Sequence, residues 1–262
     1  MIEILDKSFD RLPAALERGR KQQGSDRSWG GSEKLVPVLL GEDPGSIADA
    51  LVEAIRDGAS ETQLASAVSY AAGLRIAQFH TSNEFSDWDT ALHTFTFANA
   101  IEQGLRRAPS NELLRGVFDA AMSVWLDRFL NIPAAGLPDS GLTQTGPEEI
   151  LVQFPQLLDQ QQQINQAGNL VAQYLYGNGK VEPLLSAMGA LLLREDRDFH
   201  TIQMVEAAFR QFQRLKGSEA GIHVLVAAAR YLAAHSPTVR AQGQTYEIAY
   251  RLHRGDRIFE GG

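Results

Sequence analysis

The sequence contains no cysteine among its 262 residues. Without thiols, the chain cannot form disulfides, zinc ribbons or thiolate nucleophiles, and it cannot ligate a 2Fe–2S cluster. Long apolar runs are also missing, since the longest, Leu35–Leu40 and Val224–Ala229, are far shorter than a membrane span. The chain does not open with a basic segment followed by a long apolar stretch, so we expect a cytoplasmic protein without a membrane partner.

An excess of basic charge is lacking as well. The chain has 24 Lys and Arg against 32 Asp and Glu, a formal net charge of −8. A surface of that charge disfavours contact with phosphates, so we expect no nucleic-acid partner.

What the sequence has in quantity is helical patterning. Apolar residues recur three and four positions apart from Ser46 onward, and alternating strand patterns are absent. This predicts an all-α fold, a compact multi-helix domain. We expect helices at about Ser46–Gly58, Ser60–Ile76, Asp87–Arg107, Ser110–Phe129, Glu148–Tyr176, Val181–Leu192, Asp198–Leu215, Ser218–Ala234 and Val239–Arg254.

The first 45 residues have a different composition. An amphipathic helix interrupted by Pro13 is expected first, and Gly24–Ser32 has the composition of a flexible linker. We interpret residues 1–45 as an arm and linker on a single all-α domain of residues 46–262; a poorly ordered tail is the alternative. An arm that lies on a symmetry mate would make the protein a homo-oligomer. On this interpretation, deleting Met1–Gly41 leaves a folded domain.

The two halves of the chain resemble each other. His93–Arg107 aligns without a gap with His200–Arg214, and an aspartate, Asp89 or Asp196, stands four residues before each histidine. This predicts two pseudo-symmetric helical repeats, at about 46–130 and 165–236. Convergent helix-hairpin patterning is the alternative. If the repeats pack about a pseudo-two-fold axis, His93 and His200 should approach one polar pocket, each held by its own aspartate.

The segment His80–Asn99 (HTSNEFSDWDTALHTFTFAN) combines possible ligands with aromatic residues. His80, Glu84 and His93 fall within fourteen positions of it, together with three more polar side chains. Polar groups among large apolar side chains are typical of a dry pocket. In the structural interpretation, an aspartate caps a helix here and Asp89 orients a buried His93.

The second half offers His200, Glu206 and His235. An aspartate four residues before a histidine can hold its second ring nitrogen in a metal site, or form a structural hydrogen bond. Glu206 is six residues from His200, about 120° around a helix, and is therefore the weaker ligand. His235 ends an apolar helix, where a histidine commonly interacts with the helix dipole. Aligning the two halves places Asp127 opposite His235.

Several separated stretches carry a family resemblance: LRIAQFHTSNEFSDWDTALHTFTFANAIEQGLRRAPS, FDAAMSVWLDRFLNIP, DFHTIQMVEAAFRQF and AAARYLAAHSPTVRAQGQTYEIAYRLHRGDRIFE. From about Ile47 to Glu260 the chain resembles the helical domain of bacterial Rieske 2Fe–2S domain-containing proteins. That domain is often joined to an iron–sulfur domain. Because this chain lacks the Cys-x-His and Cys-x-x-His ligands, the resemblance implies a stand-alone helical partner of a Rieske-type ferredoxin. A weaker similarity is to the questin oxidase-like family.

Both resemblances imply a redox function. The leading hypothesis is an oxidoreductase that binds a small-molecule substrate between the repeats, as a non-haem metal-dependent oxygenase or as the partner of a Rieske-type carrier. Imidazoles with a carboxylate suit iron(II), zinc is the second choice, and a metal-free site would use the same histidines as acids and bases. We expect catalytic roles for His93, His200 and Glu84. The expected metal ligands are His80, His93, His200, Glu206 and His235.

The alternative is a non-catalytic helical module that docks a redox partner. In that case Ile76–Trp88 is a docking loop anchored by Phe85 and Trp88. Measuring the metal content of the purified protein discriminates between the two hypotheses, because one bound metal per chain would favour an enzyme.

Overall fold

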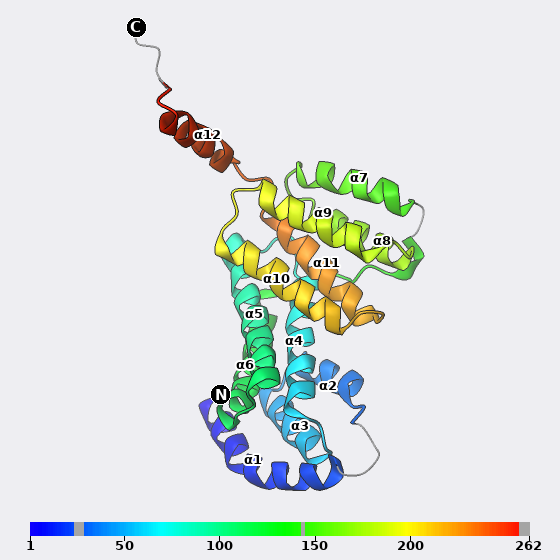
Figure 1. Ribbon diagram of the computed structural model, residues 1–262. Coiled ribbons are helices and arrows are strands. Elements are labelled where there is room, and N and C mark those ends of the chain that lie inside the picture. Colours follow the sequence, from blue (N-terminus) through cyan, green and yellow to red (C-terminus); the bar gives the residue numbers. More distant parts are fainter. Residues whose placement is uncertain (24–28, 143–144, 257–262) are drawn as a thin grey trace.

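The computed structural model describes residues 1–23, 29–142 and 145–256. These residues form twelve α-helices and two short 3-10 helices, with no strand among them (Figure 1). The predicted all-α fold is therefore confirmed. Within the described ranges, every helix is too short or too polar to cross a membrane.

The helices follow one another with short connections. In chain order they are α1 (Ile2–Gln23), α2 (Ser32–Leu39), α3 (Pro44–Arg56), α4 (Glu61–Ala77), α5 (Phe85–Arg107), α6 (Asn111–Asp127), α7 (Pro147–Leu158), α8 (Ile164–Tyr176), α9 (Val181–Arg194), α10 (Phe199–Arg214), α11 (Glu219–Ala234) and α12 (Ala241–His253).

The molecule is elongated, with α1, α2 and α3 at one end and α7, α8 and α9 at the other (Figure 1). Helices α4, α5, α6, α10 and α11 occupy the middle, and α12 projects away from the body. Helix α4 contacts α2, α5, α6 and α11, while α10 packs against both α5 and α11. The ends of α5, α10 and α11 thereby come together, and the candidate site lies there.

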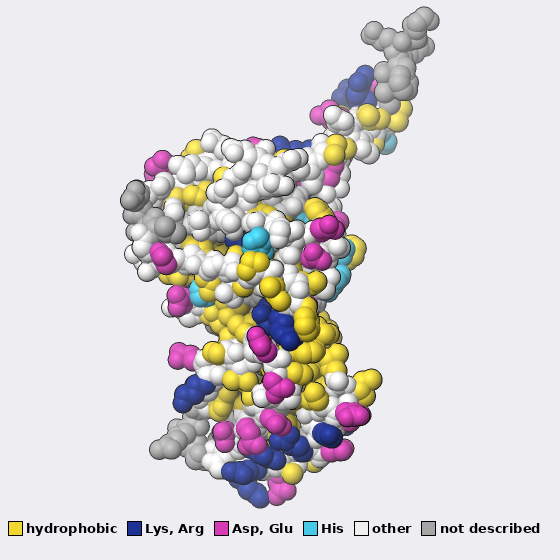
Figure 2. Space-filling view, turned by 180° about the vertical axis from the view of Figure 1, so that it is seen from behind, with side chains coloured by type: hydrophobic (Ala, Val, Ile, Leu, Met, Phe, Trp, Pro, Cys, Tyr) yellow, Lys and Arg dark blue, Asp and Glu magenta, His cyan; other side chains and the backbone are white. Residues whose placement is uncertain are grey.

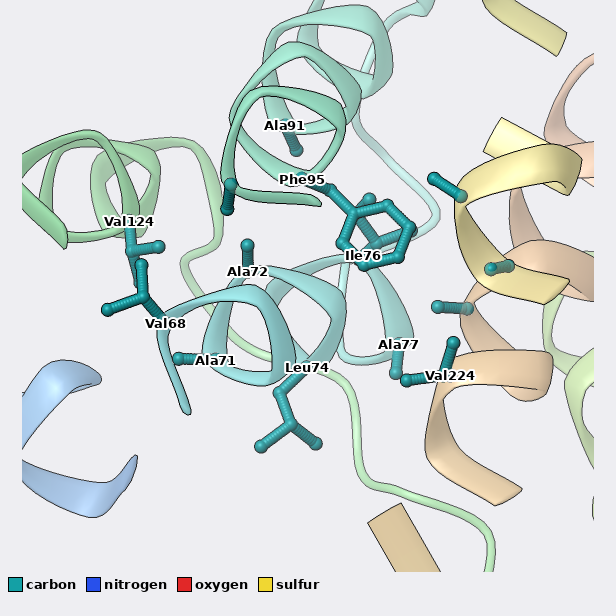
Figure 3. Close-up of a cluster of buried hydrophobic side chains, with 14 of the residues drawn as sticks. Val68, Ala71, Ala72, Leu74, Ile76, Ala77, Ala91, Phe95, Val124 and Val224 are labelled. Carbon is teal, nitrogen blue, oxygen red and sulfur yellow. The ribbon is translucent and has the colours of Figure 1, made fainter. Parts of the chain in front are cut away.

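Small residues let α4 approach its neighbours closely. A Cβ added to Gly73 would lie 3.3 Å from the Phe95 ring on α5 and 3.6 Å from Val224 on α11. Figure 3 shows the resulting core, in which side chains of α4 pack against those of neighbouring helices. The labelled residues are Val68, Ala71, Ala72, Leu74, Ile76 and Ala77 of α4, Ala91 and Phe95 of α5, Val124 of α6 and Val224 of α11.

Two helix starts differ from the expected ones. Asp43, not Ser46, caps α3: its carboxylate accepts a hydrogen bond from the Ser46 backbone N–H at 2.7 Å. Glu84 caps α5, and Asp87 lies one turn inside the helix, where its carboxylate accepts from the Glu84 N–H at 3.0 Å. In both cases the capping residue lies three positions before the one that the apolar periodicity alone indicates.

The expected single helix Glu148–Tyr176 is two helices. α7 ends at Leu158, Gln162 has a left-handed φ of 61°, and α8 begins at Ile164. The glutamine-rich connection allows α7 to pack against α8, which buries apolar side chains of both helices. In contrast, α1 continues through the exposed Pro13, where we expected an interruption.

The first 45 residues contribute to the main core. Leu12 and Ala15 of α1 and Leu35 and Leu39 of α2 are buried with residues of the central helices. α1 packs against α3 and α6, and α2 packs against α3, α4 and α6. Deleting Met1–Gly41 would therefore remove core side chains, and this packing argues against the expectation that the deletion leaves a folded domain.

The helix order of the two predicted repeats corresponds, since α4, α5 and α6 match α9, α10 and α11 in sequence. Their packing differs: α4 contacts α6, whereas α9 packs against α7 and α10. The pseudo-two-fold relation stays a prediction.

Candidate functional site

Asp89 lies where α5, α10 and α11 meet. Its Oδ1 accepts a hydrogen bond from the Tyr231 hydroxyl of α11 at 2.6 Å. His235 Nε2 is 3.4 Å from the same oxygen, and His200 Nδ1 is 4.0 Å from Oδ2. We call Asp89, Tyr231, His235 and His200 the Asp89 cluster. Two other segments, far from Asp89 in the sequence, thus place three polar side chains around its carboxylate.

Aromatic packing fixes the start of α5 beside α11. Trp88 is buried, with its ring centroid 5.0 Å from that of Phe79 and 6.4 Å from that of Tyr231. Edge-to-face contacts of this kind favour one relative orientation of the rings that make them. The carboxylate of Asp89, the next residue, is therefore held toward Tyr231.

His235 has a defined tautomer. Its Nδ1 is 2.8 Å from the backbone carbonyl of Tyr231, and a carbonyl only accepts hydrogen bonds, so Nδ1 carries a hydrogen. In the neutral imidazole, Nε2 then presents a lone pair toward Asp89 Oδ1, which is also an acceptor. Two facing acceptors repel unless they share a proton. A proton gained at His235 Nε2 would therefore lie beside Asp89 Oδ1, which favours the imidazolium.

The surroundings of His235 affect its pKa in opposite directions. The residue is 8% exposed, and its ring stacks on Tyr231 and contacts Phe85, with ring centroids 4.0 Å apart in each case. Burial lowers the pKa of His235, while the nearby carboxylates of Asp89 and Asp198 act in the opposite direction. The net effect is a pKa below the ordinary value of histidine, so the neutral base predominates at neutral pH.

His200 connects the cluster to His93. The rings of His93 on α5 and His200 on α10 have centroids 5.0 Å apart, as the alignment of the two halves predicts. His200 Nδ1 is 3.3 Å from Asp198 Oδ2, and Asp198 is the N-cap of α10. His93 is exposed, so this contact reaches from the partly buried cluster to the surface.

The two aspartates of the predicted Asp–His pairs have other partners. Asp196 precedes the start of α10 at Phe199, so it is not one helical turn from His200. Its carboxylate accepts from the backbone N–H groups of Ala241 and Gln242, at 2.6 and 2.9 Å, and caps α12 instead. Asp89 is one turn from His93 on α5, but its carboxylate is directed at α11.

Three other predicted site residues have no contact with the Asp89 cluster among the described residues. His80 Nδ1 is 2.7 Å from the Ser82 hydroxyl, in the connection between α4 and α5. Glu84 is exposed at the start of α5. Glu206 is exposed on α10 and pairs with Arg210 on the same helix. Glu206 is six residues from His200 on α10, so it lies on a different face of the helix.

The five expected metal ligands are therefore not brought together. In the described part of the chain, no group of three or more histidine, aspartate or glutamate side chains converges in a way that could hold a metal ion. The residues present do not fit an iron or zinc centre, and we derive no chemistry through one. The expected iron or zinc stays a prediction from sequence.

A small cavity borders the cluster. It has a volume of about 50 Å³, and its walls include His235, Phe85, Leu232 and Thr201. A water molecule needs roughly 10–15 Å³ by this measure, so the cavity has room for a few waters or one small substituent. Phe85 lies against His235 and is itself 57% exposed, which makes it the cover between this cavity and solvent.

A second titratable group lies in a groove between α5 and α6. The groove has a volume of about 410 Å³ and is lined by His93 and Asp127, among others. Burial raises the pKa of Asp127 to about 6, against opposing effects of Thr94 and Arg75. His93 thus lies between this groove and His200, and the predicted single pocket shared by His93 and His200 is not among the described cavities.

Sequence reasoning missed Tyr231. The signal that could have found it is spacing, because Tyr231 lies four residues before His235 and therefore shares its helix face.

Comparisons of the chain with protein-family models, with curated proteins and with solved structures found no match.

Proposed function

We propose that this protein is an enzyme that transfers a proton to or from a small organic substrate, with the Asp89–His235 pair as its acid and base. The proposal is the metal-free form of the leading sequence hypothesis. The observation that supports it most is the fixed tautomer of His235, which directs Nε2 at the Asp89 carboxylate at 3.4 Å.

Each residue of the Asp89 cluster has a role in this chemistry. Asp89 and His235 Nε2 together accept the proton that the substrate loses, and Asp89 stabilises the imidazolium that forms. The Tyr231 hydroxyl donates to Asp89 and holds its orientation. Burial raises the pKa of Tyr231 above its ordinary value, so this hydroxyl stays protonated. His200 and the exposed His93 provide a route for the proton between Asp89 and solvent.

The redox part of the proposal rests on the family resemblance alone. A substrate that has lost a proton beside His235 is more easily oxidised, and a Rieske-type ferredoxin on another chain would be the electron acceptor. We retain this partner as a proposal.

Titration of the histidine ring resonances by NMR tests the pair directly. In the wild type we expect His235 to titrate below the ordinary value of 6.5. Asp89→Asn should lower the pKa of His235 further, because the carboxylate that favours the imidazolium is removed. An identical His235 titration in wild type and Asp89→Asn would contradict the coupling between these two residues.

Deuterium exchange tests the catalytic role. Small carbon acids, such as ketones and keto acids, are incubated with the protein in deuterated water, and loss of the C–H resonance is followed. We expect wild-type catalysis of exchange for at least one of these compounds, and a loss of about a hundredfold or more in His235→Gln. His253→Gln, at an exposed position of α12, is the matched control and should keep the wild-type rate. Equal rates in His235→Gln and wild type would refute the proposal.

The second candidate function, a docking module for a redox partner, is supported by α12. This helix carries four exposed large apolar or aromatic side chains, Tyr246, Ile248, Tyr250 and Leu252, and it stands clear of the body (Figure 2). Titration of a purified Rieske-type ferredoxin into isotope-labelled protein would test it. Shifts confined to α12, together with no exchange of any carbon acid, would favour docking over catalysis.

A further inference from the structure

Arg230 is a buried cation without an anionic partner. The residue lies on α11 and is 2% exposed. Its two terminal nitrogens donate to neutral oxygens, the side-chain carbonyl of Asn165 at 2.7 Å and the backbone carbonyl of Phe79 at 2.5 Å. Its Nε is buried without a hydrogen-bond partner. Among the described residues, no carboxylate lies within ion-pair distance of the guanidinium.

Two buried glutamates in this fold are paired with arginines. Glu102, which is fully buried, forms ion pairs with Arg106 and Arg214, each at 2.8 Å. Glu195, also buried, forms an ion pair with Arg240 at 2.8 Å. Arg230 departs from this pattern, and an unpaired buried cation is costly because it has lost its hydration without gaining a counter-charge.

Arg230 keeps its charge at neutral pH. Burial lowers the pKa of its guanidinium to about 10, which still leaves the group protonated. A permanent charge in this position attracts an anion from solution if there is space for one to reach it.

A cavity provides that space. It has a volume of about 400 Å³ and is formed by Arg230 on α11, two asparagines of α8, His80, and the loop 133–136. The lining residues are His80, Pro133, Ala134, Ala135, Gly136, Asn165, Asn169 and Arg230. None of them is acidic, and several can donate hydrogen bonds.

The helix packing supports the arginine in this cavity. A Cβ at Gly168 of α8 would lie 3.0 Å from Cγ of Arg230, so the arginine stem runs close against this glycine between α8 and α11. The loop is held in place at the other wall, because Ala135 N–H donates to the Gln78 carbonyl at 2.7 Å.

We propose that this cavity binds a small organic carboxylate, with Arg230 as its counter-ion and His80, Asn165 and Asn169 as further hydrogen-bonding groups. One guanidinium matches the charge and planar shape of one carboxylate. The apolar Pro133, Ala134 and Ala135 suit the organic part of such a ligand. None of these residues belongs to the Asp89 cluster, so the proposal is independent of the proposed function.

The probes are acetate, benzoate, succinate and inorganic phosphate, each compared with chloride at equal ionic strength. Binding to the folded state raises the melting temperature by an amount that grows with the ratio of free ligand to Kd, and calorimetric titration gives the affinity. We expect saturable binding of benzoate or succinate by the wild type. Arg230→Met should weaken it at least about tenfold, because the charged hydrogen bonds to the ligand are lost.

Asn165→Asp supplies a sharper test, since it places a carboxylate where the amide oxygen now contacts Arg230. We expect this variant to melt at a higher temperature than wild type without added anion, and to bind benzoate at least about tenfold more weakly. Asn178→Asp, at an exposed turn with φ of 58°, is the matched control and should change neither property.

Three results would overturn the proposal: binding of phosphate without binding of any carboxylate, equal carboxylate affinity in Asn165→Asp and wild type, or no saturable carboxylate binding by the wild type. The Asn165→Asp comparison remains informative if Arg230→Met fails to fold.

Discussion

At the scale of single residues, the buried carboxyl of Asp127 gives the protein a specific pH dependence. Its pKa is raised by burial from 3.8 to about 6 in the folded protein. In the unfolded chain this carboxyl ionises near its ordinary pKa, so between these two values folding becomes progressively less favourable. The unfavourable contribution is absent below the unfolded value and complete above pH 6.

Asp127→Asn should therefore stabilise the protein at high pH. At 1.36 kcal/mol per pKa unit, we expect a gain of about 1–3 kcal/mol in the free energy of unfolding at about pH 8, and little change at about pH 4. Urea unfolding at both pH values measures this. A gain that is larger at the acidic pH would contradict the assignment.

Tyr231 is the residue on which the geometry of the Asp89 cluster depends most directly. Tyr231→Phe removes the hydroxyl that donates to Asp89 at 2.6 Å, and we expect a loss of about 1–3 kcal/mol in the free energy of unfolding. The pKa of His235 should rise, because the freed carboxylate interacts more strongly with the imidazolium. Tyr176→Phe is the control, since its hydroxyl contacts the exposed Glu219 at 3.2 Å and should cost little. An unchanged His235 titration in Tyr231→Phe would count against the coupling.

At the scale of elements, the first turn of α12 is tied to the body by hydrogen bonds. Asp196 accepts from two of its N–H groups, and Arg240, the residue before the helix, contacts Glu195 and Asp159. The hydrogen bonds from Arg240 and Thr238 outweigh the effect of burial and hold the pKa of Glu195 at about 2. The contacts of Glu195 thus persist to strongly acidic pH, and they fix the direction in which α12 leaves the body.

Removing this cap should act locally. Asp196→Ala is expected to destabilise the start of α12 by about 0.5–2 kcal/mol. Hydrogen exchange of the α12 amides should become faster, while global unfolding stays unchanged because α12 contributes no buried residue. Asp198→Ala, which removes the cap of the well-packed α10, should instead lower global stability by about 1 kcal/mol. A global loss in Asp196→Ala would show that α12 is packed in solution.

At the scale of the whole molecule, the two ends of the chain differ in their contribution to the core. Deletion of residues 1–41 removes buried side chains of α1 and α2, including Leu12, Leu35 and Leu39. Each buried leucine stabilises the fold by about 1.5–3 kcal/mol, so these three alone contribute about 4.5–9 kcal/mol, which is comparable with the roughly 5–15 kcal/mol stability of a typical domain. We expect this variant to be insoluble or unfolded.

Deletion of residues 241–262 is the matched comparison. The described residues of that segment contribute no buried side chain, so the variant should keep the melting temperature of the full chain. Soluble expression and circular dichroism of both variants measure the difference. A folded product from the first deletion would show that α1 and α2 are an accessory arm, as their composition suggests.

Local features of the sequence determined the class and most helix boundaries. The cap of α4 is an example: Ser60 and Gln63 exchange hydrogen bonds of 3.2 and 2.9 Å within four residues of chain. Ser110 and Ser218 cap α6 and α11 in the same local way. Such contacts depend on neighbours in the chain, so the pattern of residue types is sufficient to predict them.

The tertiary structure alone decided which polar groups meet. Asp89 and Tyr231 are separated by 142 positions, and Asp196 caps a helix that begins 45 positions later. The approach of His93 to His200 was predictable, because it follows from helix order. The partner of each aspartate was not, because it depends on how α5, α10 and α11 are rotated about their axes, and this rotation is determined by packing of the entire core. The sequence therefore determined the helices, and the packing of the helices determined the site.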